Sequence, residues 1–260
     1  MKFLVQHNLM NIEQLEKIRV ATEGYPREFV GLIPFSHDFI SDEPIEGTDY
    51  IPYGSTLMTT LALERKWKGL HFNHETFSMI ESFIFRDDMM NMDNFMTVEE
   101  AEIYLRNVDR DVFVRPDLDL KHFSGQVINS FECANWFKDA MQLGPESGSY
   151  AMDPNMYVII SAPKKIQAEF RWFVVDRKVV SGSMYRAHGQ QRLERCLDQA
   201  MIKEAQKFAN GWLPDDTCVM DLALVDGEVK VIEFNCINSS GMYDNDVSAV
   251  FKSLWELHTK

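Results

Sequence analysis

A change in hydrophobic period near residue 156 constrains the fold more than any other feature of this chain. Beyond it, apolar and polar side chains alternate in two pairs of segments, which is typical of β-strands with one buried face. Each pair surrounds a turn dipeptide, Asp176-Arg177 in the first and Asp226-Gly227 in the second, and Asp-Gly is a strong hairpin signal. We therefore predict two antiparallel hairpins, one formed by residues 167–175 and 178–185 and one by residues 217–225 and 228–235.

Helical patterns separate and follow these hairpins. Residues 193–210 form an amphipathic segment that ends at Gly211 and Pro214, so we predict a helix there. A last helix is predicted over residues 247–258. Residues 143–155, which are rich in Gly, Pro and Ser, are the clearest candidate linker.

The N-terminal third alternates between strand and helix patterns, which suggests a small α/β unit. Asn11 is a candidate cap for a helix that runs to residue 22. In the middle of the chain, Thr97 and Glu100 form a predicted capping box. The remaining predicted strands cover residues 3–6, 29–35, 111–115, 126–130 and 157–160, and the remaining predicted helices cover residues 55–66 and 131–141.

The charge balance limits the partners of this chain. Forty Asp and Glu against 26 Lys and Arg give a net charge of −14, which argues against a nucleic-acid-coating protein because that function needs a dense basic surface. No run of about 18 apolar residues is present, so we expect no transmembrane helix and no membrane partner. The first residues turn polar too early for a signal peptide. The four dispersed cysteines, without a C-x-x-C pair, indicate reduced buried thiols in a cytosolic compartment.

The second hairpin carries the sharpest group of chemical residues. Glu233 and Asn235 share one strand face about 7 Å apart, and Asp221 lies on the other strand. Two carboxylates and an amide oxygen are the hard donors that Mg²⁺ prefers. A two-residue loop would place Met220 opposite Glu233, so a metal site requires a three-residue loop or a bulge. Solvent-facing acids on an ordinary hairpin are the alternative.

These residues and several other segments resemble the ATP-grasp family. Asp221 followed by Glu233-Phe234-Asn235 resembles the metal-binding end of that fold, with an acid on one strand and Glu-x-Asn on the next. Residues 111–116 resemble the strand whose terminal basic residue reaches the nucleotide phosphates, and residues 121–125 resemble the adjoining flexible loop. Residues 163–171, followed by Arg186, resemble the strand pair that carries basic residues to the phosphoryl centre. Residues 51–55 and 69–73 resemble the N-terminal region of a predicted, peptide-ligase-like amide-ligase group of ATP-grasp proteins, which is frequent in bacteriophages and bacteria. The resemblance from residue 111 to residue 243 covers about half of the chain.

The resemblance implies a fold class of α/β plus α+β. A small N-terminal α/β domain, residues 1–88, would precede two α+β lobes, residues 89–160 and 161–260, which clamp the nucleotide. The second lobe would carry the metal and catalytic residues.

The resemblance also implies roles for individual residues and the cofactors ATP and Mg²⁺. The implied metal ligands are Asp221, Glu233 and Asn235. The implied nucleotide contacts are Arg115, Lys121, Ser161 and Glu169, with the adenine near residues 157–161. The implied catalytic residues are Arg171 and Arg186, and the implied substrate residues are Asn238, Ser240 and Tyr243.

Two departures from the family pattern affect these roles. Arg115 stands where many members have Lys, and Arg keeps the charge and can grip a phosphate with two nitrogens. Val219 stands where many members have an Arg two residues before the first metal acid, so Arg171 or Arg186 must supply that cation. A cross-strand ion pair between Glu169 and an arginine is an alternative explanation for Arg171. His71 and His74 lack a third ligand at a clear spacing, so we expect surface or packing histidines.

The implied function is that of an ATP-dependent ligase that joins a carboxylate to an amine. ATP would phosphorylate the carboxylate, and the amine would then displace phosphate from the acyl phosphate. The expected substrates are small-molecule or peptide carboxylates and amines, and the expected location is the cytoplasm, or the host cytoplasm for a viral protein. A homodimer is compatible with the sequence. Two alternatives stay open, namely a catalytically silent ATP-binding module and an acidic interaction protein that antagonises a host factor.

Overall fold

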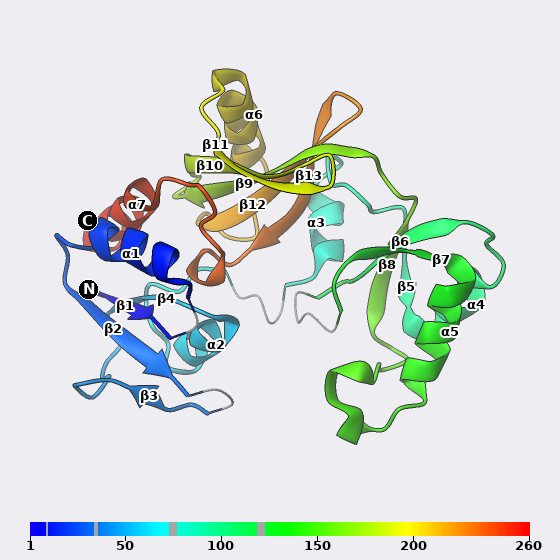
Figure 1. Cartoon of the computed structure of the whole chain (residues 1–260), viewed down its shortest axis with the longest axis horizontal. Helices are drawn as coiled ribbons and strands as arrows, with labels where there is room; N and C mark the ends of the chain where they lie inside the picture. The colour runs from blue at the N-terminus through cyan, green and yellow to red at the C-terminus, as the bar shows by residue number, and fades with distance from the viewer. Residues whose placement is uncertain (9, 34–35, 73–76, 119–122) are drawn as a thin grey trace. The chain divides into compact units, whose positions relative to one another are not determined.

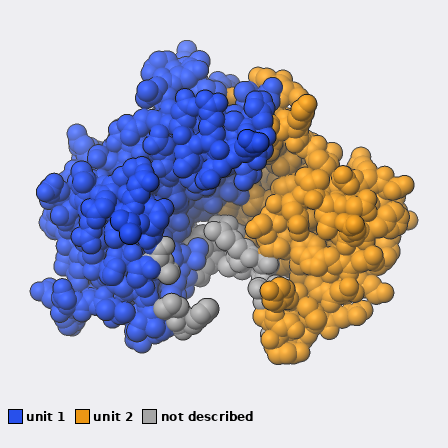
Figure 2. All heavy atoms as spheres, in the orientation of Figure 1, with its two compact units in different colours: residues 1–73, 167–224, 233–260 blue, residues 74–166, 225–232 orange. Residues whose placement is uncertain are grey.

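The computed structural model describes residues 1–8, 10–33, 36–72, 77–118 and 123–260. The chain forms two compact units, which are coloured separately in Figure 2 and are described here one at a time. Unit 1 comprises residues 1–73, 167–224 and 233–260, and unit 2 comprises residues 74–166 and 225–232. The division into residues 1–88, 89–160 and 161–260 stays a prediction. Most of residues 1–88 and 161–260 fall together in unit 1.

The first sheet of unit 1 has the predicted α/β character. Its central strand β1 pairs in parallel with β2 and β4, and the strand order is β3-β2-β1-β4. Asn11 caps the first helix as predicted, since its Oδ1 accepts a hydrogen bond from the Gln14 backbone at 2.7 Å. These elements are β1 (Lys2–Gln6), α1 (Ile12–Ala21), β2 (Arg27–Leu32), β3 (Phe39–Ile40), β4 (Tyr50–Tyr53) and α2 (Thr56–Glu64).

The second sheet contains both predicted hairpins, in the strand order β11-β10-β9-β12-β13. Most of it belongs to unit 1, whereas residues 225–232 at the end of the second hairpin belong to unit 2. Asp176 and Arg177 have φ of 52° and 61°, and Asp226 and Gly227 have φ of 51° and 84°. Positive φ at both central residues is typical of the type I′ hairpin turn, whose backbone twist matches the twist of the two strands that it joins. These elements are β9 (Ile166–Val175), β10 (Lys178–Ala187), β11 (Gln190–Arg195), α6 (Gln199–Asn210), β12 (Cys218–Val225), β13 (Glu228–Asn235), the 3₁₀ turn η2 (Ile237–Ser239) and α7 (Val247–Thr259).

The predicted start of the helix at residue 193 is wrong. His188 and Gly189, with φ of 48° and 78°, form a third tight turn that brings β11 back along β10 in the register Ala187–Gln190. The helix α6 begins only after Asp198, whose Oδ1 accepts from the Ala200 backbone at 2.8 Å. The turn at His188-Gly189 therefore overrides the helical pattern of residues 193–195, which belong to β11.

One core joins the two sheets of unit 1. Phe3 and Ile51 come from the first sheet, Phe173 and Val219 from the second and Phe251 from α7, and all are at most 1% exposed. The rings of Phe3 and Phe251 lie 5.1 Å apart. In Figure 1, α7 lies beside α1. Each buried side chain of this size stabilises the fold by about 1.5–3 kcal/mol, so the chain ends are fixed to each other by apolar packing.

Unit 2 is a four-stranded antiparallel sheet, in the order β5-β8-β6-β7, with α4 and α5 packed on its apolar face. The predicted capping box is confirmed, because the Thr97 and Glu100 side chains accept from each other's backbone at 3.2 and 2.9 Å. The candidate linker contains a short 3₁₀ segment. The elements are α3 (Met79–Phe85), β5 (Asn94–Thr97), α4 (Val98–Leu105), β6 (Asp111–Pro116), β7 (Gln126–Asn129), α5 (Ser130–Met141), η1 (Pro145–Tyr150) and β8 (Tyr157–Ser161).

All four cysteines are free, and three of them, Cys133, Cys218 and Cys236, are buried, as predicted. Burial raises the pKa of Cys133 and of Cys236 to about 12, which keeps both thiols protonated. Across the described part of the chain, none of the helices has the length and apolar character needed to cross a membrane.

Candidate active site on the second sheet

The residues that we predicted as metal ligands lie together in unit 1. The Asn235 Nδ2 atom donates to Asp221 Oδ2 at 3.5 Å and to Glu233 Oε1 at 3.3 Å. Asp221 is 1% exposed, which is unusual for a carboxylate in an apolar strand. The three side chains therefore share one face of the β12–β13 hairpin.

This arrangement requires an irregularity in the hairpin. Its turn is the two-residue turn Asp226-Gly227, from which regular pairing would place Asp221 and Glu233 on opposite faces. Because both carboxylates contact the Asn235 amide, the pairing must shift by one residue between the turn and Glu233.

A buried arginine faces these acids from β9. Arg171 donates from Nε to Asp221 Oδ1 at 2.9 Å and from Nη2 to Asp221 Oδ2 at 2.7 Å, and the two side chains are 11% and 1% exposed. Burial alone would lower the pKa of Arg171, but the charge of Asp221 and its hydrogen bonds outweigh that effect and raise the pKa. Burial raises the pKa of Asp221, and the charge of Arg171 opposes the rise. The pair is thus a two-pronged ion pair in which Arg171 stays charged.

The rings of two tyrosines lie beside the Arg171 guanidinium. The rings of Tyr185 and Tyr243 stack with centroids 5.0 Å apart and planes 18° apart, and the Arg171 Cζ lies 4.8 Å from the Tyr243 centroid. Tyr243 has φ of 48°, a left-handed conformation that is rare for a bulky residue and is found mainly where the surrounding structure enforces it. Arg171 Nη1 also donates to the Gly241 carbonyl at 3.4 Å. The guanidinium is therefore fixed by the acid, the stacked ring and the backbone of the turn after β13.

Glu169 and Arg186 form a second ion pair at this end of the sheet. They are paired residues of β9 and β10, and Arg186 Nη1 lies 3.3 Å from Glu169 Oε1. Glu169 is 10% exposed at its side chain, whereas Arg186 is 51% exposed. The cross-strand ion pair that we considered thus forms with Arg186. Burial, together with the charges of Asp221 and Glu169, raises the pKa of Tyr185 beside them.

The predicted nucleotide residues of unit 2 lie on neighbouring strands. Arg115 is on β6 and donates from Nε to the Pro116 carbonyl at 3.3 Å, and Ser161 at the end of β8 pairs with Phe113 of β6. Ser161 is 1% exposed, and its hydroxyl accepts from the Asp93 backbone at 3.3 Å. Lys121 lies outside the described residues. The nucleotide roles of these residues stay predictions.

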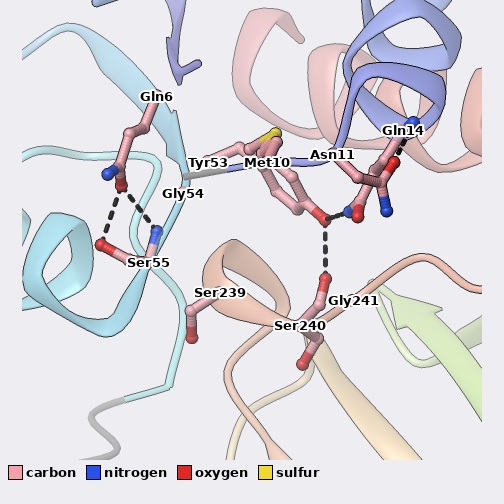
Figure 3. A pocket seen from close by; sticks show the side chains of 10 residues that line it. All are labelled: Gln6, Met10, Asn11, Gln14, Tyr53, Gly54, Ser55, Ser239, Ser240 and Gly241. Carbon is pink, nitrogen blue, oxygen red and sulfur yellow. Dashed lines mark hydrogen bonds between the residues drawn. The ribbon is translucent and has the colours of Figure 1, made fainter. Parts of the chain in front are cut away.

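The predicted substrate residues follow β13 and differ in their surroundings. Asn238 is 1% exposed, and its Nδ2 donates to the carbonyls of Pro52 and Gly69 at 2.7 and 2.9 Å. Its Oδ1 accepts from the His71 backbone at 3.0 Å, so the amide ties the turn to the first sheet. Ser240 instead lines a pocket of about 420 Å³, which Figure 3 shows.

No group of three or more His, Cys, Asp or Glu side chains in the described residues could hold a metal ion. The set Asp221, Glu233 and Asn235 contains two carboxylates and an amide, and such oxygen donors suit Mg²⁺ completed by phosphates and water. The Arg171 fork occupies one lone pair on each Asp221 oxygen, and each carboxylate oxygen has a second one. The second lone pair of Oδ2 contacts the Asn235 Nδ2, so a metal ion would replace that contact once the Asn235 amide turns its Oδ1 toward the acids. The donor set therefore fits Mg²⁺.

The histidine expectation agrees with the structure for His71. Its Nε2 lies 2.8 Å from the Nε2 of His258, and its Nδ1 lies 3.6 Å from Asp215 Oδ1. His74 lies outside the described residues.

Sequence reasoning missed Tyr185, Tyr53, Gln14 and Gly241. Tyr185 precedes Arg186 in the predicted hairpin, and that position was the available signal. The others come together through the packing of the first sheet on the second, which no local pattern encodes.

Comparisons with known proteins identify the family and the fold of the chain. A family model described as "ATP-grasp domain, R2K clade family 2" matches residues 94–253, more than half of the chain. No curated protein matches this sequence. A RimK domain protein ATP-grasp from Sphaerobacter thermophilus has 11% identity and a TM-score of 0.62, with 98% of this chain and 100% of that chain covered.

Two further solved structures show the same fold. D-alanyl-alanine synthetase A from Vibrio cholerae has 11% identity and a TM-score of 0.60, with 100% of this chain and 99% of that chain covered. The ATP-grasp ligase PsnB, solved with a minimal precursor, Mg and ADP, has 12% identity and a TM-score of 0.53, with 99% and 98% covered. The prediction of an ATP-grasp fold is confirmed, and the chain belongs to the ATP-grasp family.

Proposed function

We propose that this protein is an ATP-dependent carboxylate–amine ligase that works through an acyl phosphate. The observation that carries the proposal is the group of Arg171, Glu233 and Asn235 around the buried Asp221 carboxylate, which lies inside the segment matched by the family model. The structural neighbours include ligases and a synthetase, and this agrees with the proposed reaction class.

The acidic group would hold Mg²⁺ through Asp221, Glu233 and Asn235. An Mg²⁺ ion held by these residues would neutralise charge on the nucleotide phosphates during phosphoryl transfer. Arg171 fixes the orientation of Asp221 through two hydrogen bonds, much as outer-shell partners orient metal ligands. We therefore propose that Arg171 contributes to phosphoryl transfer by holding the acidic group as well as by its charge.

The remaining roles follow the exposure of each side chain. The Arg186 side chain is half-exposed, and a hydrogen bond joins its Nη1 to Glu169. Because it is not enclosed, it can turn toward a transferring phosphoryl group. Arg115, Lys121, Ser161 and Glu169 are proposed to contact the nucleotide. Ser240, at the pocket, is proposed to contact the substrate, whereas the contacts of Asn238 and Tyr243 favour positioning roles.

A catalytically silent ATP-binding module is a second candidate, and one observation favours it. Both oxygens of Asp221 are engaged by Arg171, which a metal would have to share. A cytoplasmic location, a bacteriophage source and a homodimer remain proposals from the sequence.

The experiment that tests the proposal is phosphate release from Mg–ATP across a panel of carboxylates and amines. A ligase releases phosphate only when both a carboxylate and an amine are present, and mass spectrometry then detects the amide product. Stabilisation by Mg–ATP without turnover in any mixture would identify the silent module and refute the ligase.

A further inference from the structure

The pocket in Figure 3 lies entirely within unit 1 and has a volume of about 420 Å³, within the usual range for a small-ligand site. Its walls come from the start of α1, from the junction of β4 and α2, and from residues 239–241 of the turn after β13. Every described residue that lines it is uncharged. An ammonium or carboxylate group would therefore enter this pocket without a side chain of opposite charge to compensate it.

Most polar groups of the wall are already bonded to one another. Gln6 is fully buried, and its Oε1 accepts from the Ser55 backbone and hydroxyl, both at 2.8 Å. The Tyr53 hydroxyl donates to the Ser240 carbonyl at 2.7 Å, and burial raises the pKa of Tyr53, so it stays neutral. These bonds give the pocket a fixed shape.

Two amide groups on α1 and its cap keep capacity for a ligand. Asn11 uses Oδ1 to cap the Gln14 backbone at 2.7 Å, which leaves its NH₂ group. Gln14 uses Nε2 to donate to the Tyr53 hydroxyl at 3.1 Å, which leaves Oε1 as an acceptor. Neither the Asn11 NH₂ nor the Gln14 Oε1 has a hydrogen-bond partner in the part of the chain that the structure describes. A donor beside an acceptor matches the C=O and N–H of one residue in an extended peptide, because these two groups point to the same side.

The pocket also borders the residues that hold Arg171. Gly241 lines the pocket, and its carbonyl accepts from Arg171 Nη1 at 3.4 Å. A molecule seated in the pocket therefore lies along the turn that connects to the buried acidic group.

We infer that this pocket binds one uncharged, extended residue of a peptide substrate, whose C=O accepts from the Asn11 NH₂ and whose N–H donates to the Gln14 Oε1. The inference rests on the proposed ligase and names its substrate class, a peptide rather than a free amino acid. The pocket selects the peptide because the N–H and C=O of one residue inside a peptide satisfy both side-chain groups and bring no charge, whereas a zwitterion brings two charges.

The test uses ligand-observed NMR without ATP, with N-acetylalanine N-methylamide and with free alanine as probes. We expect the neutral probe to bind and alanine to give no saturable signal. Asn11→Ser keeps an oxygen that can cap α1 but removes the NH₂ donor, so it should weaken binding of the neutral probe about tenfold. Asn129→Ser, at the equivalent cap of α5 in unit 2, is the matched control and should leave binding unchanged.

Asn11→Asp provides a test that does not depend on loss of binding. It keeps the cap and adds a negative charge, so alanine N-methylamide, which carries an ammonium group, should now bind better than the neutral probe. Equal binding of alanine and the neutral probe to the unmodified protein, or unchanged binding in both Asn11 variants, would overturn the inference.

A thermal shift with Mg–ATP on the same samples separates the two proposals. Stabilisation by Mg–ATP without binding of the neutral probe would refute the peptide pocket and leave the ligase. If the neutral probe binds with the predicted variant effects but Mg–ATP causes no thermal shift, the ligase is refuted and the amide site is supported.

Discussion

Removing one partner of the Arg171–Asp221 pair should destabilise unit 1 far more than removing both. Each partner is buried, at 11% and 1% side-chain exposure, and they share two hydrogen bonds of 2.9 and 2.7 Å. A buried charge that loses its partner typically costs about 3–5 kcal/mol. We therefore expect Arg171→Met and Asp221→Asn each to lower the free energy of unfolding by about that amount.

The double variant should recover much of this loss, because no uncompensated charge remains at the pair. The coupling energy should therefore exceed the cost of the milder single variant, about 3 kcal/mol or more, which lies above the roughly 0.5–3 kcal/mol usual for residues in contact. The nearby carboxylates Glu169 and Glu233 would partly compensate Arg171 in Asp221→Asn, so that single variant should be the milder one.

The assay is urea unfolding followed by tryptophan fluorescence in a Trp136→Phe background. Because a chain with two units need not unfold in one step, the signal must come from one unit. Trp136 lies in unit 2, and the other tryptophans all lie in unit 1 at positions 67, 172, 212 and 255. Single-variant effects that add to within about 0.5 kcal/mol in the double variant would refute the description of a coupled, buried ion pair.

Three further predictions concern neighbouring residues. Tyr243→Phe should keep the turnover number because the stacked ring remains. Tyr243→Ala should reduce the turnover number about tenfold or more, because Arg171 loses the ring that positions it. Equal turnover in both variants would exclude a role for the ring. Burial beside His71 lowers the pKa of His258 to about 4, so the native state favours neutral His258 and stability should fall as the pH drops from about 6.5 through 4. Thermal midpoints measured across that range should change less in His258→Gln, and an identical pH dependence would contradict the assignment. Arg186→Ala should lower kcat with little change in the melting temperature, since Arg186 is 51% exposed, and an unchanged kcat would remove it from the proposed catalytic group.

Local signals in the sequence predicted much of the fold. Asp226-Gly227 and Asp176-Arg177 fix their turns because both residues of each pair adopt positive φ, and the Thr97–Glu100 capping box starts α4 where expected. The helical pattern that begins at residue 193 was misleading, because the turn at His188-Gly189 brings β11 into the sheet. Tight turns are local in sequence, whereas the choice between a strand and a helix on either side depends on tertiary pairing.

The candidate site was predictable in its composition and less so in its contacts. The spacing of Glu233 and Asn235 on one strand indicated a shared face, and the structure agrees. The partner of Arg171 was not predictable, because it depends on which strand lies next to β9 and on a shift in hairpin pairing. The pocket combines α1, β4 and the turn after β13, which are separated by most of the sequence.

The proposed Mg²⁺ site at Asp221, Glu233 and Asn235 is tested by the Mg–ATP thermal shift of the unmodified protein and of Glu233→Gln. At a nucleotide concentration one hundred times the dissociation constant, binding should stabilise the unmodified protein by about 2.7 kcal/mol. Glu228→Gln is the matched control, because Glu228 is exposed on the same strand. We expect Glu233→Gln to lose the Mg²⁺-dependent part of the shift while Glu228→Gln keeps it, and an undiminished shift in Glu233→Gln would exclude Glu233 as a metal ligand.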